Sequence, residues 1–419
     1  MLNPLYTRIA LLTVAFGLFF GCTQEPAIQE AKLNLNRENY QEAVRSANRA
    51  IKEKPESPEA YYYHGVIHYR IAQQKVNPSK RKRNYRFMRG SLSQAKQLYE
   101  KQELPAKEQR DINPLLQEAW SDEHNSGVRI LKNDTSMTDD LLTNAIAHLE
   151  NATTIIPDST ISLEALANAY YKADQYQRAI TTFEKLVQKD TLEKDGIWEK
   201  LAYLHLEQGN AEEATRYYSK AEAAFTENVN VIHGLANAYI SQSNHNKSVP
   251  LLRDLVQRAP NNLEYRMTLG TELYYFARQK LDSVIAHKST ASYTDSTFEA
   301  MMQQKRQDAD QLLMEAEQHF LKAVSLDRKN PEVLQTTATF HQNTAALYKQ
   351  LREALPEEER QSTNQLIDTH LEAAIPYYQN LVDSQQETKP YWDNLFQIYS
   401  YLGQTEKAEE ALQKANPDR

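Results

Sequence analysis

Two histidines stand at a spacing that suits a metal ion. The stretch HGVIH places His64 and His68 four residues apart, so on a helix both rings lie on one face at the separation of zinc ligands. The alternative is packing, because these positions fall where comparable segments carry Leu or Tyr, and His205 and His341 fall where His68 does. We favour packing and predict no bound metal and no other cofactor.

Patterns typical of enzymes are missing from the sequence. None of the eleven histidines is followed by glutamate, which excludes the HExxH zinc-protease motif, and none has a glutamate three residues before it, which excludes the usual di-iron pattern. The ten glycines are isolated, so neither a G-x-G dinucleotide loop nor a Walker A loop exists. We therefore expect a protein without catalytic activity.

The single cysteine, Cys22, follows an apolar amino-terminal run. The start, MLNPLYTRIALLTVAFGLFFG, has Arg8 as its only charged side chain, and residues 9–20 are uncharged. This is the layout of a secretory signal peptide. A helix over residues 9–20 rises about 18 Å, whereas the hydrocarbon core of a bilayer is about 30 Å thick, so the run is too short for a permanent span. We predict a signal peptide over residues 1–21.

The residues around Cys22 resemble the bacterial lipobox, with the small residue Gly21 directly before the thiol and Phe19 where that motif usually has leucine. The resemblance implies that the Cys22 thiol is acylated and that cleavage makes Cys22 the first residue. Residues 22–25 are then a short tether between the lipid and the folded chain. The alternative is ordinary secretion after cleavage near Gly21, which leaves a bare thiol.

The composition favours helices. Ten glycines in 419 residues are too few for many β-hairpins, while Ala, Leu, Glu, Gln and Lys are abundant. We predict an all-α chain. The formal net charge of -8 disfavours binding to nucleic acid, because that binding depends on neutralising phosphates.

A repeat with a period of 34 residues is the most specific pattern in the chain. In WEKLAYLHLEQGNAEEATRYYSKAEAAF the pattern comprises Trp198, Leu201, Ala202, Gly209, Ala214, Tyr218 and Ala221. A step of 34 residues brings the pattern to Ile232, Leu235, Ala236 and Tyr239. This resembles the tetratricopeptide repeat. The resemblance implies a right-handed α-solenoid of eight or nine helix-turn-helix units over residues 26–416, followed by a short tail at 417–419.

The repeat also predicts local features. Each unit should be two amphipathic helices joined by a turn such as those at Gly209 and Gly403, and small residues should let the two helices approach closely. These small residues are Gly65, Ala167, Ala202, Ala236 and Gly270. Extra residues near 75–130, 278–312 and 343–370 predict three extended helical hairpins. The turn of the third is expected near Pro356, and Pro376 is expected to start or kink the next helix.

The resemblance also indicates where a partner would bind. In tetratricopeptide repeats, positions 2, 5, 9, 12 and 13 of the first helix line a concave groove, and asparagine at position 9, here Asn168 and Asn237, often holds a peptide backbone. The residues that fall on groove positions are Tyr62, Tyr69, Arg70, Glu164, Asn168, Tyr171, Lys172, Glu199, Tyr203, Glu207, His233, Asn237, Met267, Tyr274 and Tyr275.

One segment is strongly basic. KVNPSKRKRNYRFMRG contains seven Lys or Arg and no acid: Lys75, Lys80, Arg81, Lys82, Arg83, Arg86 and Arg89. Such a run near a lipid-anchored end can attract anionic head groups. The alternative is a solvated segment neutralised by Glu100, Glu103 and Asp111.

These features together predict a lipid-anchored scaffold of the envelope of a Gram-negative bacterium, on the periplasmic face of the outer membrane. It would bind a peptide segment or helix of protein partners in the groove, and it could self-associate through its hairpins. The alternative function is a helical-repeat glycan receptor that partners an outer-membrane transporter. The three tryptophans, Trp120, Trp198 and Trp392, are dispersed rather than gathered into a stacking platform, which favours the scaffold.

Overall fold

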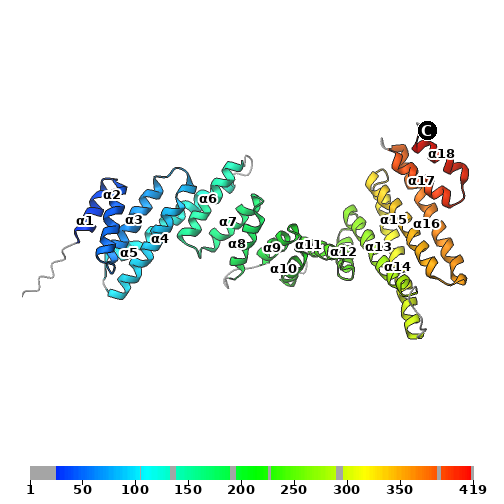
Figure 1. Ribbon diagram of the computed structural model, residues 1–419, viewed down its shortest axis with the longest axis horizontal. Helices are drawn as coiled ribbons and strands as arrows, with labels where there is room; N and C mark the ends of the chain where they lie inside the picture. The colour runs from blue at the N-terminus through cyan, green and yellow to red at the C-terminus, as the bar shows by residue number, and fades with distance from the viewer. Residues whose placement is uncertain are drawn as a thin grey trace, which may run out of the picture. The chain divides into compact units, whose positions relative to one another are not determined.

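The computed structural model describes residues 25–103, 105–132, 138–188, 195–224, 228–288, 296–384 and 388–416. The regular structure of these residues is helical throughout, with 18 α-helices, one short 3-10 helix and no strand (Figure 1). The all-α prediction is confirmed. The predicted signal peptide, Cys22 and the tail at 417–419 lie outside the described residues.

The chain divides into two compact units at Gln188 and Lys189. In the first unit the helices pack as consecutive pairs, α1 with α2 and onward to α7 with α8, and the short η1 (Pro78–Lys80) precedes α4. The helices are α1 (Pro26–Asn36), α2 (Tyr40–Glu53), α3 (Pro58–Gln73), α4 (Lys82–Gln102), α5 (Lys107–Lys132), α6 (Asp139–Ile155), α7 (Thr160–Lys172) and α8 (Tyr176–Val187).

The second unit continues the same pattern from α9 paired with α10 to α17 paired with α18. Its helices are α9 (Asp195–Glu207), α10 (Ala211–Ala224), α11 (Val229–Ser241), α12 (His245–Arg258), α13 (Leu263–Lys288), α14 (Ser296–Leu326), α15 (Pro331–Ala354), α16 (Glu357–Ser384), α17 (Lys389–Tyr401) and α18 (Thr405–Ala415). The described residues thus form nine helix pairs, which agrees with the eight or nine units expected.

Small residues lie where two helices of a pair touch, as the repeat predicts. Ala167, Ala202 and Ala236 are fully buried. A Cβ atom on Gly65 would lie 2.7 Å from Leu92 Cγ, and one on Gly270 would lie 2.9 Å from Phe320 Cζ. These glycines are therefore required by the close approach of the second helix of the pair.

The short turns of five pairs share a left-handed residue. Gly209 and Gly403, the predicted turn residues, have φ of 73° and 70°. Glu38, Asp174 and Ser243 occupy the matching place in other pairs with φ of 58°, 54° and 53°. The turn conformation is thus kept even where a side chain makes it costly, since left-handed backbone disfavours residues other than glycine.

The predicted extensions appear as longer helices within ordinary pairs. Helices α13 and α14 have 26 and 31 residues, and α15 and α16 have 24 and 28. The third turn is at Leu355 and Pro356, as expected, whereas Pro376 lies inside α16 and starts no helix. The first predicted extension, residues 75–130, spans two pairs: α4 is the second helix of the pair with α3, and α5 is the first helix of the pair with α6. The predicted loop of the second extension falls largely on residues 289–295, outside the described residues.

Candidate functional site

The first helices of the pairs carry the predicted groove residues, and α7 presents its set in the first unit. Leu166, Ala167 and Tyr170 are buried, which orients the helix. Glu164 and Asn168 are half-buried, while Tyr171 and Lys172 are exposed at its carboxyl end. Tyr171 is 41% exposed and lies 6.2 Å, between ring centroids, from Tyr176 at the start of α8. The α7 residues are thus present at a surface.

The residues predicted on α3 do not all reach the surface. Tyr69 is buried, and its hydroxyl donates to Glu118 Oε1 at 3.2 Å and accepts from Gln73 Nε2 at 2.7 Å. Burial, followed by the charge of Asp111, raises the pKa of the half-buried Tyr62 to about 12. Arg70 is exposed and donates to Gln73 Oε1 at 3.1 Å. Tyr69 therefore belongs to the core of the first unit rather than to an exposed face.

In the second unit, α9 and α11 present polar groups at the predicted positions. Tyr203 is 40% exposed, Glu207 is exposed, and the half-buried Glu199 accepts from Asn228 Nδ2 at 3.4 Å. Asn237 and His233 are both half-buried one turn apart on α11. The Asn237 amide lies 3.1 Å from His233 Nε2. This contact holds the amide in a defined orientation at the surface of the helix.

On α13 the predicted set separates into core and surface. Tyr274 is buried and meets Phe340 edge to face at 6.1 Å between ring centroids. Tyr275 is 45% exposed and stacks on His245 at 6.3 Å. Met267 is half-buried and packs against the core. Tyr275 is therefore a surface group, whereas Tyr274 stabilises the packing of α13 against α15.

The two histidines at metal-ligand spacing are packed side chains. His64 Nδ1 lies 2.7 Å from Ser91 Oγ, and His68 Nδ1 lies 3.1 Å from Asn84 Oδ1. The rings meet at 4.6 Å, and His68 stacks on Phe87. Burial and then the neighbouring imidazole lower the pKa of His64 to about 4. Within the described ranges, no three His, Cys, Asp or Glu side chains gather as metal ligands.

A second histidine pair lies in the core of the second unit. His341 Nδ1 and His370 Nδ1 are 3.1 Å apart, on α15 and α16. Burial lowers the pKa of both rings to about 4, with the His370 charge a smaller cause for His341. Tyr377 stacks on His341, and Tyr348 stacks on His370. The repeat register predicted that His341 packs, but it did not predict its partner.

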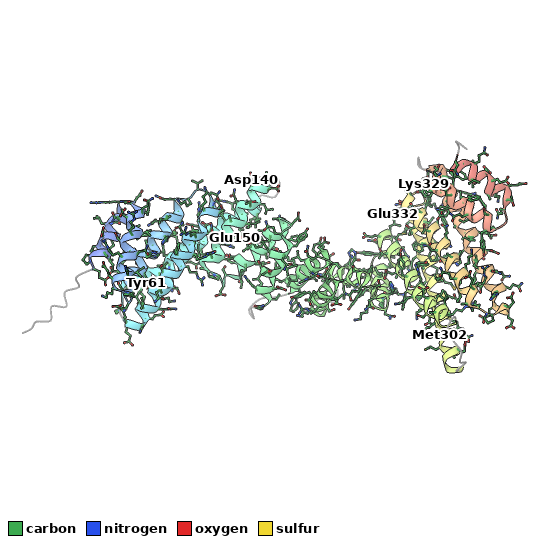
Figure 2. All side chains as sticks on the ribbon, viewed as in Figure 1. Tyr61, Asp140, Glu150, Met302, Lys329 and Glu332 are labelled. Atoms are coloured by element: carbon green, nitrogen blue, oxygen red, sulfur yellow. The ribbon has the colours of Figure 1, made fainter. Side chains whose placement is uncertain are left out.

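The basic segment is partly neutralised by the fold. Arg81 donates to Glu123 Oε1 at 2.9 Å and to the carbonyl of Lys75 at 2.6 Å. Lys82 donates to Oε2 of Glu150 on α6 at 2.7 Å (Figure 2). These two cations therefore hold the segment before α4 against α5 and α6. The exposed cations are Lys75, Lys80, Arg83, Arg86 and Arg89.

Glu123 on α5 is a buried polar centre that the sequence did not reveal. Its carboxylate accepts hydrogen bonds from Arg81, from Tyr85 at 2.7 Å, from His148 at 2.6 Å and from Asn151 at 3.2 Å. Burial acts to raise the pKa of Glu123, but these hydrogen bonds outweigh burial and hold the pKa below its usual value. The carboxylate is thus kept charged inside the first unit.

Among the residues that the structure describes, no helix is both long enough and apolar enough to cross a bilayer.

Comparison with known families identifies the repeat. Tetratricopeptide-repeat models match residues 28–71 and 164–228, residues 205–270, and residues 390–416. These matches show tetratricopeptide repeats within residues 28–71, 164–270 and 390–416, and the helix pairs of the described residues follow the same paired arrangement. No curated protein matches the sequence.

Three of the solved structures that match part of the chain, all at low sequence identity, are the following. The crystal structure of MamA protein is 16% identical over 51% of this chain and 93% of its own, with a TM-score of 0.37. MamA 41-end from Desulfovibrio magneticus RS-1 is 16% identical over 51% and 97%, with a TM-score of 0.36. YrrB, described as a TPR protein with an unusual peptide-binding site, is 12% identical over 51% and 89%, with a TM-score of 0.37.

Proposed function

We propose that this protein is a scaffold that binds protein partners through the exposed faces of its first helices and acts without catalysing a reaction. The observation that carries the proposal is the exposure of Tyr171, Tyr203 and Tyr275, which are 41%, 40% and 45% exposed at groove positions. Tyrosine supplies a large contact area at low entropic cost, and it is enriched where proteins bind each other.

The polar groups around these tyrosines fit a peptide backbone. Asn168 lies on the same helix as Tyr171, and Asn237 occupies the position in α11 that Tyr203 occupies in α9. A carboxamide offers both a donor and an acceptor, which is what a backbone amide requires. A partner would thus meet aromatic surface and backbone-directed hydrogen bonds on one helix face.

The location is part of the same proposal. The signal-peptide layout and the lipobox-like Gly21 and Cys22 support a lipid anchor at the outer membrane of a Gram-negative bacterium, facing the periplasm. Mass spectrometry of the native amino-terminal peptide tests the anchor. We expect an acylated Cys22 as the first residue, and an intact, unmodified amino terminus would contradict the proposal.

Partner binding is tested by crosslinking and affinity capture from the native envelope. We expect Asn168→Ala and Asn237→Ala together to reduce recovery of specific partners without lowering the melting temperature. The matched control combines Gln177→Ala on α8 and Asn246→Ala on α12, two exposed amides on second helices, and it should capture the partners normally. Equal capture by both double variants would contradict the assignment of the first-helix faces. A thermal shift with oligosaccharides instead would favour the glycan-receptor alternative.

A further inference from the structure

A polar groove lies along one face of α4, and none of its lining residues is a predicted partner-binding position. It has a volume of about 510 Å³ and is lined by Arg86, Arg89, Gly90, Ser93, Gln94 and Gln97 of α4 together with Thr154 of α6. The α4 residues follow one another at helical spacing, so they form one continuous stripe. This volume lies within the range of small-molecule sites.

The two guanidinium groups in this groove have no acidic partner among the residues that the structure describes. No ion pair joins Arg86 or Arg89 to a carboxylate of the described residues, and both side chains are exposed. Among the other cations of the basic segment, Arg81 is engaged by Glu123 and Lys82 by Glu150, while the exposed Lys75, Lys80 and Arg83 do not line the groove. Two guanidinium groups, about one helical turn apart, thus lie together on the lining of the groove.

The acid one helical turn before Thr154 on α6 is already neutralised. Glu150 lies one turn before Thr154 on α6, pairs with both Lys82 and Arg178, and accepts from the Tyr170 hydroxyl at 2.7 Å. Burial acts to raise the pKa of Glu150, but the contacts with Lys82, Tyr170 and Arg178 hold it below its usual value. An anion in the groove thus meets a carboxylate whose charge is compensated.

Gly90 supplies an independent argument. It lies in the middle of α4, where glycine weakens a helix relative to alanine. Apart from its two chain neighbours and the backbone of its own helix, no atom of the described residues lies within 4 Å of the position that a Cβ atom on Gly90 would occupy, whereas Gly65 and Gly270 are each required by a neighbouring side chain. No contact within the fold calls for a glycine at this position. Its effect is to leave the floor of the groove open between Arg86, Arg89 and Gln94.

We propose that this groove binds a phosphate ester whose other half carries hydroxyl groups, such as a glycerol or sugar phosphate. Arg86 and Arg89 pair with the phosphate oxygens, since guanidinium groups bind phosphate through two parallel hydrogen bonds. The amides of Gln94 and Gln97 and the hydroxyl of Ser93 donate to and accept from the ligand hydroxyls. The phosphate ester is either the head group of an anionic lipid or a soluble compound.

Calorimetric titration of the full-length chain distinguishes these two sources. The probes are sn-glycerol 3-phosphate and dihexanoyl phosphatidylglycerol below its micelle concentration, with dihexanoyl phosphatidylcholine as the neutral comparison. Tighter binding of the phosphatidylglycerol assigns a lipid head group, and tighter binding of glycerol phosphate assigns a soluble ester. Binding of neither probe at millimolar concentration, or equal binding of both short-chain lipids, would overturn the proposal.

Three variants separate the groove from general charge attraction. Arg86→Ala with Arg89→Ala should weaken binding of the preferred probe about 10-fold to 100-fold. Lys75→Ala with Lys80→Ala removes the same charge outside the groove and should weaken binding of the preferred probe less than 3-fold. Gly90→Leu keeps every charge but fills the floor, so it should abolish binding while raising the melting temperature by about 2 °C.

The Gly90→Leu result decides between a site and a charged surface. Unchanged binding by this variant would show that the cations attract the probe without a groove, and the proposal would fail. The proposal does not depend on the first-helix faces, because the Asn168 and Asn237 variants should bind the probe normally.

Discussion

Replacing Glu123 by glutamine should release the segment before α4 from the first unit. The glutamine oxygen can still accept from Arg81 and Tyr85, but its amino group faces the Asn151 amide, which is also a donor. The variant loses the charge opposite Arg81 and gains a donor-to-donor conflict in a site that is 1% exposed. Breaking one partner of a buried pair costs about 3–5 kcal/mol, and because glutamine keeps part of the network we expect about 3 kcal/mol.

Local opening is measured on the full chain by trypsin cleavage and amide hydrogen exchange. The segment contains tryptic sites at Lys75, Lys80 and Arg81. A loss of about 3 kcal/mol increases the open population, and with it the cleavage rate, about 100-fold where opening is fast relative to cleavage. Exchange of the α4 and α5 amides should rise with it.

The control is Asp122→Asn, which removes one charge from the exposed neighbouring position on α5. We expect it to change the opening free energy by less than about 0.5 kcal/mol. If Glu123→Gln cleaves at the same rate as this control, the carboxylate does not hold the segment, and the reasoning is wrong.

Three further predictions concern the second unit. Gly234→Ala should lower the free energy of unfolding by about 1–3 kcal/mol in urea titrations, because its Cβ would lie 2.2 Å from Tyr218 Cζ; full stability would contradict this packing. Ser243→Gly should raise the free energy of unfolding by about 0.5 kcal/mol, and with it the melting temperature, because Ser243 has φ of 53°. A lower melting temperature would contradict the strain argument. Burial sets the pKa of His341 and His370 to about 4 in the fold. The unfolded chain therefore binds more protons than the folded chain between pH 6.5 and pH 4. The stabilisation from neutral His341 is fully present above pH 6.5, and it falls by on the order of 3 kcal/mol as the pH drops to 4. Hydrogen exchange at pH 7 and pH 5 should show this loss in α15 and α16, and His370→Leu should reduce it.

The repeat pattern predicts the helix pairs because the same contacts recur in every pair. Gly65, Ala202 and Gly270 are small since a second helix packs directly on them, so their spacing carries structural information. The turns are predicted from glycine at Gly209 and Gly403, but Ser243 adopts the same conformation without one. The residues around Ser243 include no glycine, so only the register of the repeat predicts a turn there.

The candidate site is less predictable because groove positions describe an average repeat. Tyr69 and Tyr274 fall on such positions, yet Glu118 on the lengthened α5 and Phe340 on the lengthened α15 contact them. Residues from an extension thus cover positions that an ordinary unit leaves exposed. Glu123 escapes prediction for a related reason, since its partners come from segments 25 to 42 residues away and follow no period.

Within each unit, the main contacts of an α-helix lie with α-helices one or two places away along the chain. Structure of this kind needs no partner from distant, later sequence before it can form. A nascent chain that emerges amino terminus first, from a ribosome or from an export channel, can complete α1 with α2 while the carboxyl-terminal pairs are still unmade. Its exposed apolar surface at any moment is then limited to the most recently emerged helices, which reduces the time available for aggregation during biogenesis.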